Sequence, residues 1–302
     1  MTRSGFVAVA GRPNVGKSTL VNALVGAKVA VTSDKPQTTR RAIRGIATGE
    51  RDGEPWQVVL VDLPGVQTPR DVLTERMQRR VEHELKESDA ALFVLNGAER
   101  SAGGDRFIAA ALARAKLPVV VAVNKMDVLS RARTAAALVG AAELEEAGVD
   151  VREVVPVSAL KGTGVEIVRD ALAGLLPEGP FYFPAEQRSD QPLAIALAEL
   201  VREQALRRTR DEIPHSIEVH VEDVERRPDG LTVVRAVLWA ETDSQRVILI
   251  GRGGRMVREI GTGARTEIER ELGTRVHLDL TVKVRRGWRR DEGLLDRLGI
   301  EA

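Results

Sequence analysis

Apolar and polar positions follow two different patterns along the 302-residue chain. Through residues 1–176, short runs of β-branched and other apolar residues are separated by stretches with helical spacing. This is typical of βαβ units in a mostly parallel sheet. The expected strands are Phe6–Ala10, Ile43–Thr48, Gln57–Asp62, Ala90–Asn96, Pro118–Asn124 and Val154–Val157. The expected helices cover Thr19–Leu24 and about 71–87, 104–115, 131–147 and 164–176.

The alternation stops at residues 177–192, which contain four prolines and a polar run. Such composition marks a linker between domains, and its aromatic triplet Phe181–Phe183 favours a linker pinned to a surface. Beyond it we expect helices at Leu193–Thr209, Ser244–Ile250 and Arg255–Leu272 and strands at Ser216–Glu225, Leu231–Glu241 and Val276–Arg285. The predicted architecture is therefore an α/β domain over residues 1–176, with a doubly wound, mostly parallel sheet, and a smaller α+β domain over 193–302.

Composition excludes several classes of protein. With 43% apolar and 29% charged residues the chain has the balance of a soluble globular protein. The absence of cysteine excludes disulfides and cysteine-based metal sites. We expect no signal peptide, and apolar runs such as Val119–Val123 are too short to span a bilayer.

Charge is distributed unevenly. The net charge is +1, but residues 246–290 contain twelve Lys or Arg and five Asp or Glu. A basic segment on an otherwise acidic chain is typical of a polyanion-binding region. A solvated charged helix is the alternative.

A complete phosphate-loop sequence, G-x-x-x-x-G-K-[ST], lies between the first expected strand and the first expected helix, which is the context the motif requires. It comprises Gly11, Arg12, Pro13, Asn14, Val15, Gly16, Lys17 and Ser18, followed by Thr19. The glycines let backbone N–H groups close on a phosphate. Lys17 can reach the β- and γ-phosphates, and the Ser18 hydroxyl can bind Mg²⁺.

Three further motifs follow expected strands and together indicate a guanine nucleotide. They are Asp62, Leu63, Pro64 and Gly65; Asn124, Lys125, Met126 and Asp127; and Ser158, Ala159 and Leu160. Asp62 can hold Mg²⁺ through water, and the Gly65 N–H can contact the γ-phosphate. The Asp127 carboxylate can accept two hydrogen bonds from guanine, a donor pair that adenine lacks. The Lys125 stem can cover the base, and the last motif can donate a backbone N–H to guanine O6.

The polar stretch Pro36–Arg40 contains two threonines between the phosphate loop and Asp62. We expect Thr39, with Thr38 as the second choice, to bind Mg²⁺ in the GTP state. The motifs occur in the order, and at the strand ends, of the ligand loops of a doubly wound sheet. Together they resemble the translation-factor-related class of GTPases.

A glycine-rich tetrad separates two expected helices in the second domain. G-x-x-G between helices is how a KH domain clamps single-stranded nucleotides, and nearby arginines supply counter-charge to the phosphates. The expected RNA contacts are Arg246, Ile250, Gly251, Arg252, Gly253, Gly254, Arg255 and Arg258, and, after the last strand, Lys283, Arg285, Arg286 and Trp288. Trp288 is expected either to stack on a base or to pack in the protein.

The order helix–strand–strand–helix–GxxG–helix–strand resembles a type II KH domain. A GTPase domain joined to such a domain resembles the Era family of ribosome-assembly GTPases over residues 5–300. The resemblance implies GTP or GDP with Mg²⁺, binding to the 3′ end of 16S rRNA, and a role in 30S subunit assembly. It also implies a cytoplasmic protein with some peripheral association at the inner face of the cell membrane. We expect a monomer.

The sequence departs from many GTPases immediately after Gly65. Val66 stands where a water-orienting glutamine is common, so we expect slow intrinsic hydrolysis. Lys17, Thr39 and Asn14 are the candidate catalytic residues. In related GTPases an asparagine at the position of Asn14 helps to bind K⁺, which would stabilise developing charge; a purely structural Asn14 is the alternative.

Two other functions stay open at this point. The chain would be a non-enzymatic RNA-binding module if guanine nucleotide served only as a structural ligand. It would be an ATP-dependent kinase if the phosphate loop bound ATP for phosphoryl transfer, but Asp127 favours guanine over adenine. A switch that hydrolyses GTP and docks on rRNA is the preferred interpretation.

Overall fold

The computed structural model describes residues 2–32, 40–64, 71–99, 103–210 and 213–300. In this described part, six strands form one sheet in the order β2-β3-β1-β4-β5-β6. Only β2 of these six described strands runs antiparallel to its neighbour. The strands are β1 (Arg3–Ala10), β2 (Ile43–Arg51), β3 (Glu54–Asp62), β4 (Ala90–Asn96), β5 (Pro118–Asn124) and β6 (Asp150–Pro156).

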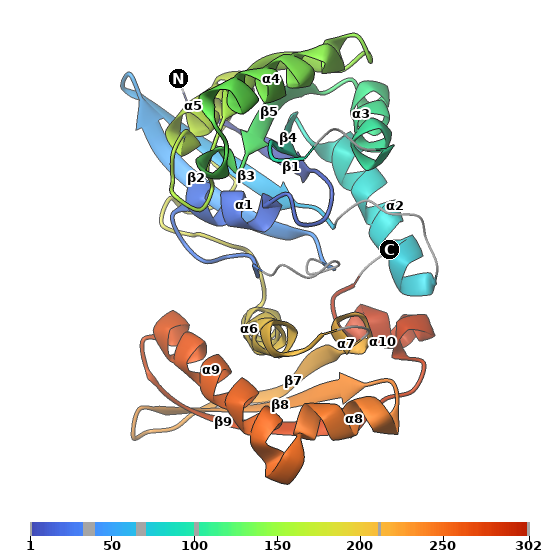
Figure 1. Cartoon of the computed structure of the whole chain (residues 1–302). Coiled ribbons are helices and arrows are strands. Elements are labelled where there is room, and N and C mark those ends of the chain that lie inside the picture. Colours follow the sequence, from blue (N-terminus) through green and yellow to red (C-terminus); the bar gives the residue numbers. More distant parts are fainter. Residues whose placement is uncertain (1, 33–39, 65–70, 100–102, 211–212, 301–302) are drawn as a thin grey trace.

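Helices cover both faces of this sheet (Figure 1). They are α1 (Lys17–Val25), α2 (Val72–Glu87), α3 (Gly103–Ala115), α4 (Arg131–Ala142) and α5 (Val165–Leu175). α1 and α5 bury their apolar stripes in one core cluster, and α2, α3 and α4 bury theirs in the cluster on the opposite face. Strands such as β4 are buried on both faces, which is why they read as continuous apolar runs. The doubly wound prediction is confirmed.

The linker is pinned to the first sheet, as its aromatic residues led us to expect. The fully buried Gln57 side chain accepts hydrogen bonds from the backbone N–H groups of Tyr182 and Phe183 and donates to the Phe183 carbonyl at 2.8 Å. The Tyr182 ring lies 4.8 Å from that of Phe6. Arg188 accepts a backbone hydrogen bond from β2 at Ile46. The linker thus extends along the edge of the sheet.

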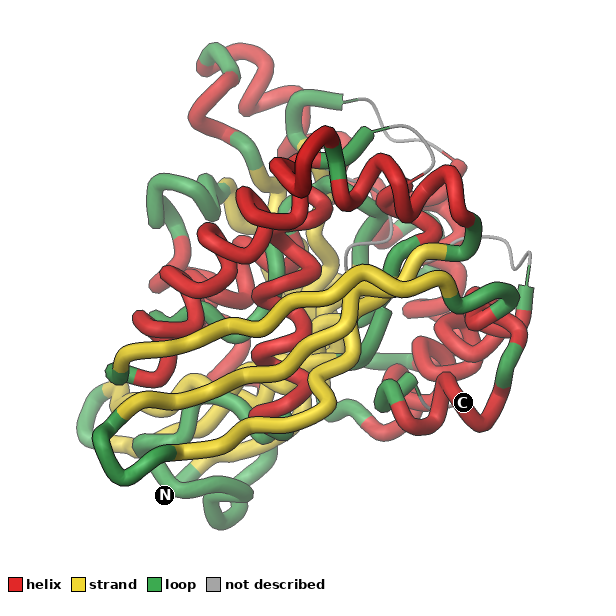
Figure 2. Tube along the Cα trace, turned by 90° about the horizontal axis from the view of Figure 1, so that it is seen from below, coloured by secondary structure: helices red, strands yellow, loops and turns green. Residues whose placement is uncertain are grey.

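The second domain is built on a sheet that contains three strands in the described residues, in the order β7-β8-β9. Its elements are α6 (Leu193–Arg208), α7 (Ile213–Ser216), β7 (Glu218–Arg226), β8 (Leu231–Ala240), α8 (Asp243–Ile250), α9 (Arg255–Leu272), β9 (Arg275–Val284) and α10 (Glu292–Arg297). β8 pairs antiparallel with β7 and parallel with β9, and the three lie side by side when seen from below (Figure 2). Helices α6, α8 and α9 pack on one face. This is the predicted order of a type II KH domain.

Two boundaries differ from expectation. The helix expected at 131–147 ends at Ala142 and continues as a 3₁₀ turn, Glu143–Glu145, a tightening that is frequent at helix ends. The strand expected at Val154–Val157 runs from Asp150 to Pro156. This edge strand has several exposed residues, so its first half lacks the apolar pattern of a buried strand. Helices α7 and α10 were not predicted.

Candidate functional site

The phosphate loop joins β1 to α1 at the point where the strand order reverses between β1 and β4. Ligands of doubly wound sheets bind outside the carboxyl ends of the strands at such a point. Gly16 caps α1 with a φ of 99°, and a Cβ built there would lie 2.3 Å from Asn124 Nδ2. A larger side chain at this position would collide with the Asn124 side chain at the end of β5. Glycine is therefore required by both backbone conformation and space.

Lys17 and Ser18 lie at the start of α1, where unpaired helix N–H groups and the helix dipole favour an anion. The buried Lys17 ammonium donates hydrogen bonds to the carbonyls of Gly11 at 3.0 Å and Arg12 at 3.1 Å. Burial lowers the pKa of Lys17, and the nearby Asp62 carboxylate opposes that shift. The Ser18 hydroxyl donates to Asp62 Oδ2 at 2.7 Å. A hydroxyl and a carboxylate brought together are hard oxygen donors of the kind that Mg²⁺ prefers.

The guanine motif is assembled by Asn124 and Asp127 beside the loop of Ser158–Leu160. The buried Asn124 side chain donates to the Val15 carbonyl at 2.8 Å and accepts from the Ala159 N–H at 3.0 Å. Asn124 thus ties the phosphate loop to the third motif. The Asp127 carboxylate is solvent-exposed and accepts a hydrogen bond of 2.7 Å from the Ser158 hydroxyl. Its exposure leaves it accessible to a base.

The remaining nucleotide residues divide into three groups. Val15 and Leu63 are buried in the core, while Leu160 is 79% exposed. Arg12 turns towards α3, where its guanidinium contacts Asp105 at 2.9 Å and Glu99 at 3.0 Å. Thr38, Thr39, Gly65 and Val66 lie outside the described residues. The described part thus places Lys17, Ser18, Asp62, Asn124 and Asp127 at one edge of the sheet.

The GxxG tetrad forms a turn between α8 and α9 that contains three glycines in left-handed or otherwise unusual backbone conformations. Gly251, Gly253 and Gly254 all have positive φ. A Cβ at Gly251 would lie 2.7 Å from Met256 Cβ, so the turn is too tight for a larger residue. The exposed Arg258 donates to the carbonyls of Gly253 and Gly254 and stabilises the turn. Arg252 and Arg255 are exposed beside it, whereas Arg246 and Ile250 are partly buried.

The basic run that begins at the end of β9 divides into exposed and buried parts. Lys283, Arg285 and Arg286 are exposed, and Arg286 reaches the start of α8 through a 3.0 Å contact with Asp243. Trp288 is fully buried, and its indole N–H donates to the Ser216 carbonyl at 3.0 Å. The assignment of Trp288 as an RNA-stacking residue is therefore wrong for this conformation. Its ring packs with α2 and α10 instead.

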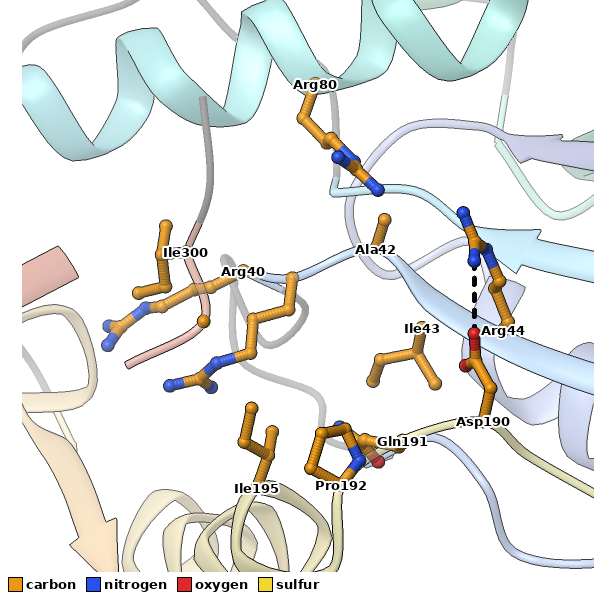
Figure 3. Close-up of a pocket in the computed structure, with 12 residues that line it drawn as sticks. Arg40, Ala42, Ile43, Arg44, Arg80, Asp190, Gln191, Pro192, Ile195 and Ile300 are labelled. Atoms are coloured by element: carbon orange, nitrogen blue, oxygen red, sulfur yellow. Dashed lines mark hydrogen bonds and ion pairs between the residues drawn. The ribbon is translucent and has the colours of Figure 1, made fainter. Parts of the chain in front are cut away.

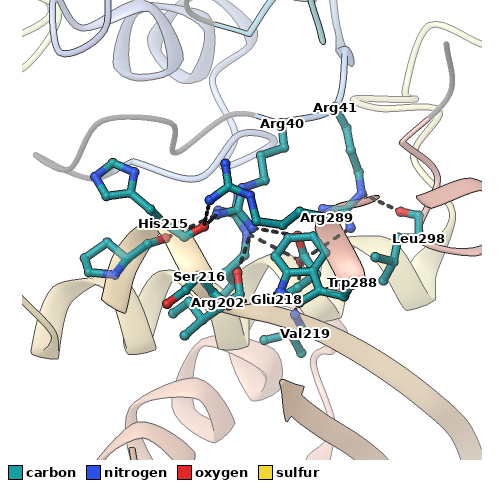
Figure 4. A network of polar contacts seen from close by, with 12 residues as sticks. Arg40, Arg41, Arg202, His215, Ser216, Glu218, Val219, Trp288, Arg289 and Leu298 are labelled. Carbon is teal, nitrogen blue, oxygen red and sulfur yellow. Dashed lines mark hydrogen bonds and ion pairs between the residues drawn. The ribbon is translucent and has the colours of Figure 1, made fainter. Parts of the chain in front are cut away.

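A buried charge cluster joins the two domains and was not foreseen from the sequence (Figure 4). The fully buried Arg40 guanidinium donates to Glu218 at 2.9 Å and to the backbone carbonyls of Ile217, Pro214 and His215. Arg41 pairs with Glu199 and with Glu218. Burial lowers the pKa of Arg40 to about 10, while Glu218 opposes the shift. Two arginines in a polar stretch give no signal of such burial in the sequence.

Comparison with known proteins places these features in a family. A family model described as a 50S ribosome-binding GTPase matches residues 6–125, and a KH domain model matches residues 212–289. The chain is 47% identical to the GTPase Era of Mycolicibacterium paratuberculosis over 98% of both chains. It is 46% identical to that of Mycobacterium tuberculosis, again over 98% of both.

Solved structures agree over the whole length. A crystal structure of Era in complex with MgGDPNP and nucleotides 1506–1542 of 16S ribosomal RNA has a TM-score of 0.93 at 34% identity and covers all of both chains. A variant of Aquifex aeolicus Era bound to GDP·AlF4⁻ has a TM-score of 0.92 at 33% identity, covering 99% of this chain and 100% of that one. With a phosphate-loop domain and a KH domain in the same order, this chain belongs to the Era family of GTPases.

Proposed function

We propose that this chain is a GTP-binding and GTP-hydrolysing switch that binds the 3′ end of 16S rRNA and acts in assembly of the small ribosomal subunit. The observation that carries the proposal is the convergence of Lys17, Ser18, Asp62 and Asp127 at one edge of the first sheet, in a chain whose second domain presents the GxxG turn. The Era structure with MgGDPNP and 16S rRNA nucleotides supports the same assignment.

The residues present fit Mg²⁺ and a guanine nucleotide. The contact between Ser18 and Asp62 provides the oxygen donors, and we assign Thr39, with Thr38 as the second choice, as the further ligand. When bound, Mg²⁺ neutralises charge on the phosphate oxygens. Asp127 selects guanine by accepting two hydrogen bonds, and backbone N–H groups of the phosphate loop with Lys17 hold the phosphates.

Hydrolysis by this chain is slow on its own because Val66 has no polar atom to orient the attacking water. We assign Lys17 to stabilising charge on the transferred phosphoryl group. Asn14 has a left-handed backbone, with φ of 63°, a conformation that asparagine tolerates better than most residues. We assign Asn14 to a K⁺ that assists catalysis. Turnover measured in K⁺ and in Na⁺ tests this role, and equal rates would exclude it.

RNA binding is assigned to the GxxG turn and the exposed arginines around it. The turn's tight backbone lets a nucleotide strand approach, while Arg252, Arg255 and Arg258 provide counter-charge. Lys283, Arg285 and Arg286 extend the basic surface towards the start of α8. Electrophoretic or fluorescence titration of an oligonucleotide from the 16S rRNA 3′ end tests the assignment, which requires tighter binding than to a scrambled sequence.

We also propose that the chain is a monomer with three parts. These are a GTPase domain over residues 1–176, a linker over 177–192 and a KH domain over 193–302. No helix in the described residues has the length and apolar character needed to cross a membrane. We propose a cytoplasmic location with peripheral association at the inner face of the membrane, in line with the family resemblance. Co-sedimentation with anionic lipid vesicles tests that association, and protein that stays in the supernatant would exclude it.

A further inference from the structure

The two chain segments that complete the nucleotide site both end in contacts with the KH domain. Arg40 directly follows Thr39 in the sequence, and Asp71 follows the segment that begins at Gly65. Both side chains cross to the second domain, Arg40 to Glu218 at 2.9 Å and Asp71 to Arg289 at 2.6 Å. The GTPase domain is therefore held on the KH domain by one residue that directly follows Thr39 in the sequence and one that lies six positions after Gly65.

These two contacts meet at one backbone carbonyl. His215, in α7, accepts a hydrogen bond from Arg40 Nη2 at 3.1 Å and another from Arg289 Nη1 at 3.2 Å. Arg40, His215, Arg289 and Asp71 thus form a continuous chain of polar contacts between the two segments. Figure 4 shows Arg40, His215 and Arg289 of this chain. The Trp288 ring packs against one member of this chain, because the Arg40 guanidinium lies over the ring, 5.3 Å from its centre.

An apolar cluster runs beside this polar chain. Leu73 and Met77, from the first turns of α2, pack with Trp288 and with Leu294, Leu295 and Leu298 around α10. Asp71 itself caps α2 by accepting the Thr74 N–H at 2.9 Å through Oδ1, while its Oδ2 faces Arg289. A displacement of the α2 N-terminus therefore moves Arg289 and Trp288 as well.

The KH side of the same junction leads directly to the predicted RNA surface. Arg285 and Arg286 are exposed and precede the buried Trp288 and the partly buried Arg289 by only a few residues. Only Gly287 separates Arg286 from Trp288, so the backbone that carries the two exposed arginines is anchored directly at the junction. A single stretch of chain thus carries both the domain junction and part of the basic surface.

The junction also contains unfilled space. A cavity of about 190 Å³ lies beside Arg40 and Arg41, bounded by Arg80 of α2, Asp190 of the linker and Ile300 (Figure 3). Close-packed interiors resist small displacements, whereas side chains that border a cavity have room to rearrange. The junction therefore combines charged pairs with a cavity that leaves the neighbouring side chains room to move.

We propose that Asp71, Arg289 and Arg40 are positioning residues that couple the nucleotide site to the RNA-binding surface. This inference rests on the proposed function, because it requires a nucleotide at the phosphate loop and RNA at the KH domain. The coupling is reciprocal: RNA bound at the basic run stabilises one arrangement of the Arg40–His215–Arg289–Asp71 chain, and the nucleotide state selects the same arrangement.

The test compares Asp71→Asn with Glu267→Gln in the full chain. Asparagine caps a helix as well as aspartate does, so Asp71→Asn removes the charge facing Arg289 and retains α2. Glu267→Gln is a matched control, because Glu267 also pairs across the domains, with Lys28 at 3.1 Å, but neither residue belongs to the Arg40–His215–Arg289–Asp71 chain. Affinity for a fluorescent 16S rRNA 3′-end oligonucleotide is measured with GDP and with MgGDPNP.

In the unaltered protein we expect the two RNA affinities to differ by about 5–150-fold, the usual range of allosteric coupling. Asp71→Asn is expected to bring this ratio close to one while the affinity for GDP stays unchanged, and Glu267→Gln is expected to keep it. Arg289→Met is expected to lose the ratio, and Arg289→Lys, which retains a cation, to recover part of it. In the presence of RNA, Asp71→Asn lowers kcat and leaves KM for GTP unchanged.

The inference is overturned if Asp71→Asn keeps the ratio of the unaltered protein, or if Glu267→Gln loses it equally. A ratio of one in the unaltered protein also overturns it. Failure of the proposed function is a separate result, visible in the same titrations as absence of nucleotide binding or of RNA binding.

Discussion

The side-chain amide of Asn124 donates a hydrogen bond of 2.8 Å to the backbone carbonyl of Val15. The bond joins the end of β5 to the phosphate loop, and it is buried. Asn124 therefore holds the two loops together, whereas Asp127 is exposed to solvent. Substitutions of Asn124 and of Asp127 are therefore expected to affect nucleotide binding differently.

Asn124→Asp removes only the donor, because the new carboxylate still accepts from the Ala159 N–H. The Val15 carbonyl then loses its partner and faces a negative charge, at a cost on the order of 1–3 kcal/mol. We expect GDP affinity to fall by about ten-fold to a hundred-fold with no change in base preference. Fluorescent nucleotide titration with guanine and xanthine nucleotides measures both quantities.

Asp127→Asn is expected to change base preference. The amide can no longer accept both guanine donors, and the loss of two charge-assisted hydrogen bonds reduces GDP affinity by roughly 10²- to 10⁴-fold. Xanthine presents a carbonyl at the position of the exocyclic amine, which the new amide can contact. Competition between GDP and xanthosine diphosphate measures the change; an unchanged preference for guanine would remove the assignment of Asp127.

Gly253→Asp is expected to abolish RNA binding. Its stability is expected to fall no further than that of the control variant Gly273→Asp. Gly253 and Gly273 have φ of 59° and 63°, and a Cβ at either position meets no atom within 4 Å. Both substitutions thus add the same charge and the same backbone strain, one in the GxxG turn and one at the far end of α9. Weaker RNA binding by Gly253→Asp alone supports the clamp. Equal effects would show that the turn makes no specific contact.

Glu218 is expected to make the protein sensitive to acid. Burial raises the pKa of its carboxyl, but Arg41, Arg40 and Arg202 outweigh this effect and lower it from 4.5 to about 2. Since the folded state binds the proton more weakly than the unfolded state, the stabilisation is present above pH 4.5 and is lost as the pH falls towards 2. Urea unfolding between pH 7 and pH 2.5 measures the free energy of unfolding.

The matched variants for this measurement are Glu218→Gln and Glu222→Gln. Removing the buried charge leaves its arginines uncompensated and costs about 3–5 kcal/mol at pH 7, and the variant should show a flatter pH dependence. Glu222 is half-exposed beside Lys283, so Glu222→Gln should cost less than about 1 kcal/mol. A similar loss in both variants would mean that the buried cluster does not stabilise the domain junction.

Local patterns predicted most elements and the nucleotide motifs. Strands such as β4 and β5 match because residues buried on both faces form uninterrupted apolar runs. The phosphate loop, Asp62 and Asp127 were found because each motif directly follows such a strand. The half-exposed edge strand β6 and the six-residue helix α10 lack these signals. The predicted strand is therefore shorter than β6, and α10 is not predicted.

The contacts of the domain junction could not be predicted from local patterns, because they join residues far apart in the sequence. Arg40 and Glu218 are separated by 178 residues. Arg40 ends the Pro36–Arg40 stretch, but that motif gives no sign of a partner in the KH domain, and Glu218 sits in no motif. Trp288 shows the same limit. Its arginine-rich surroundings fit an RNA contact, but its burial is decided by Ser216 and by α2, which composition cannot reveal. The contacts at the domain junction were therefore the ones least accessible to sequence patterns.

The most direct test of the whole account is steady-state GTP hydrolysis in K⁺ buffer, with and without a short RNA from the 16S rRNA 3′ end. The account predicts slow hydrolysis by the protein alone and a higher kcat with RNA, an increase that Gly253→Asp abolishes and Gly273→Asp retains. An unchanged rate in the presence of bound RNA would contradict it, because the KH domain would then only anchor the GTPase domain.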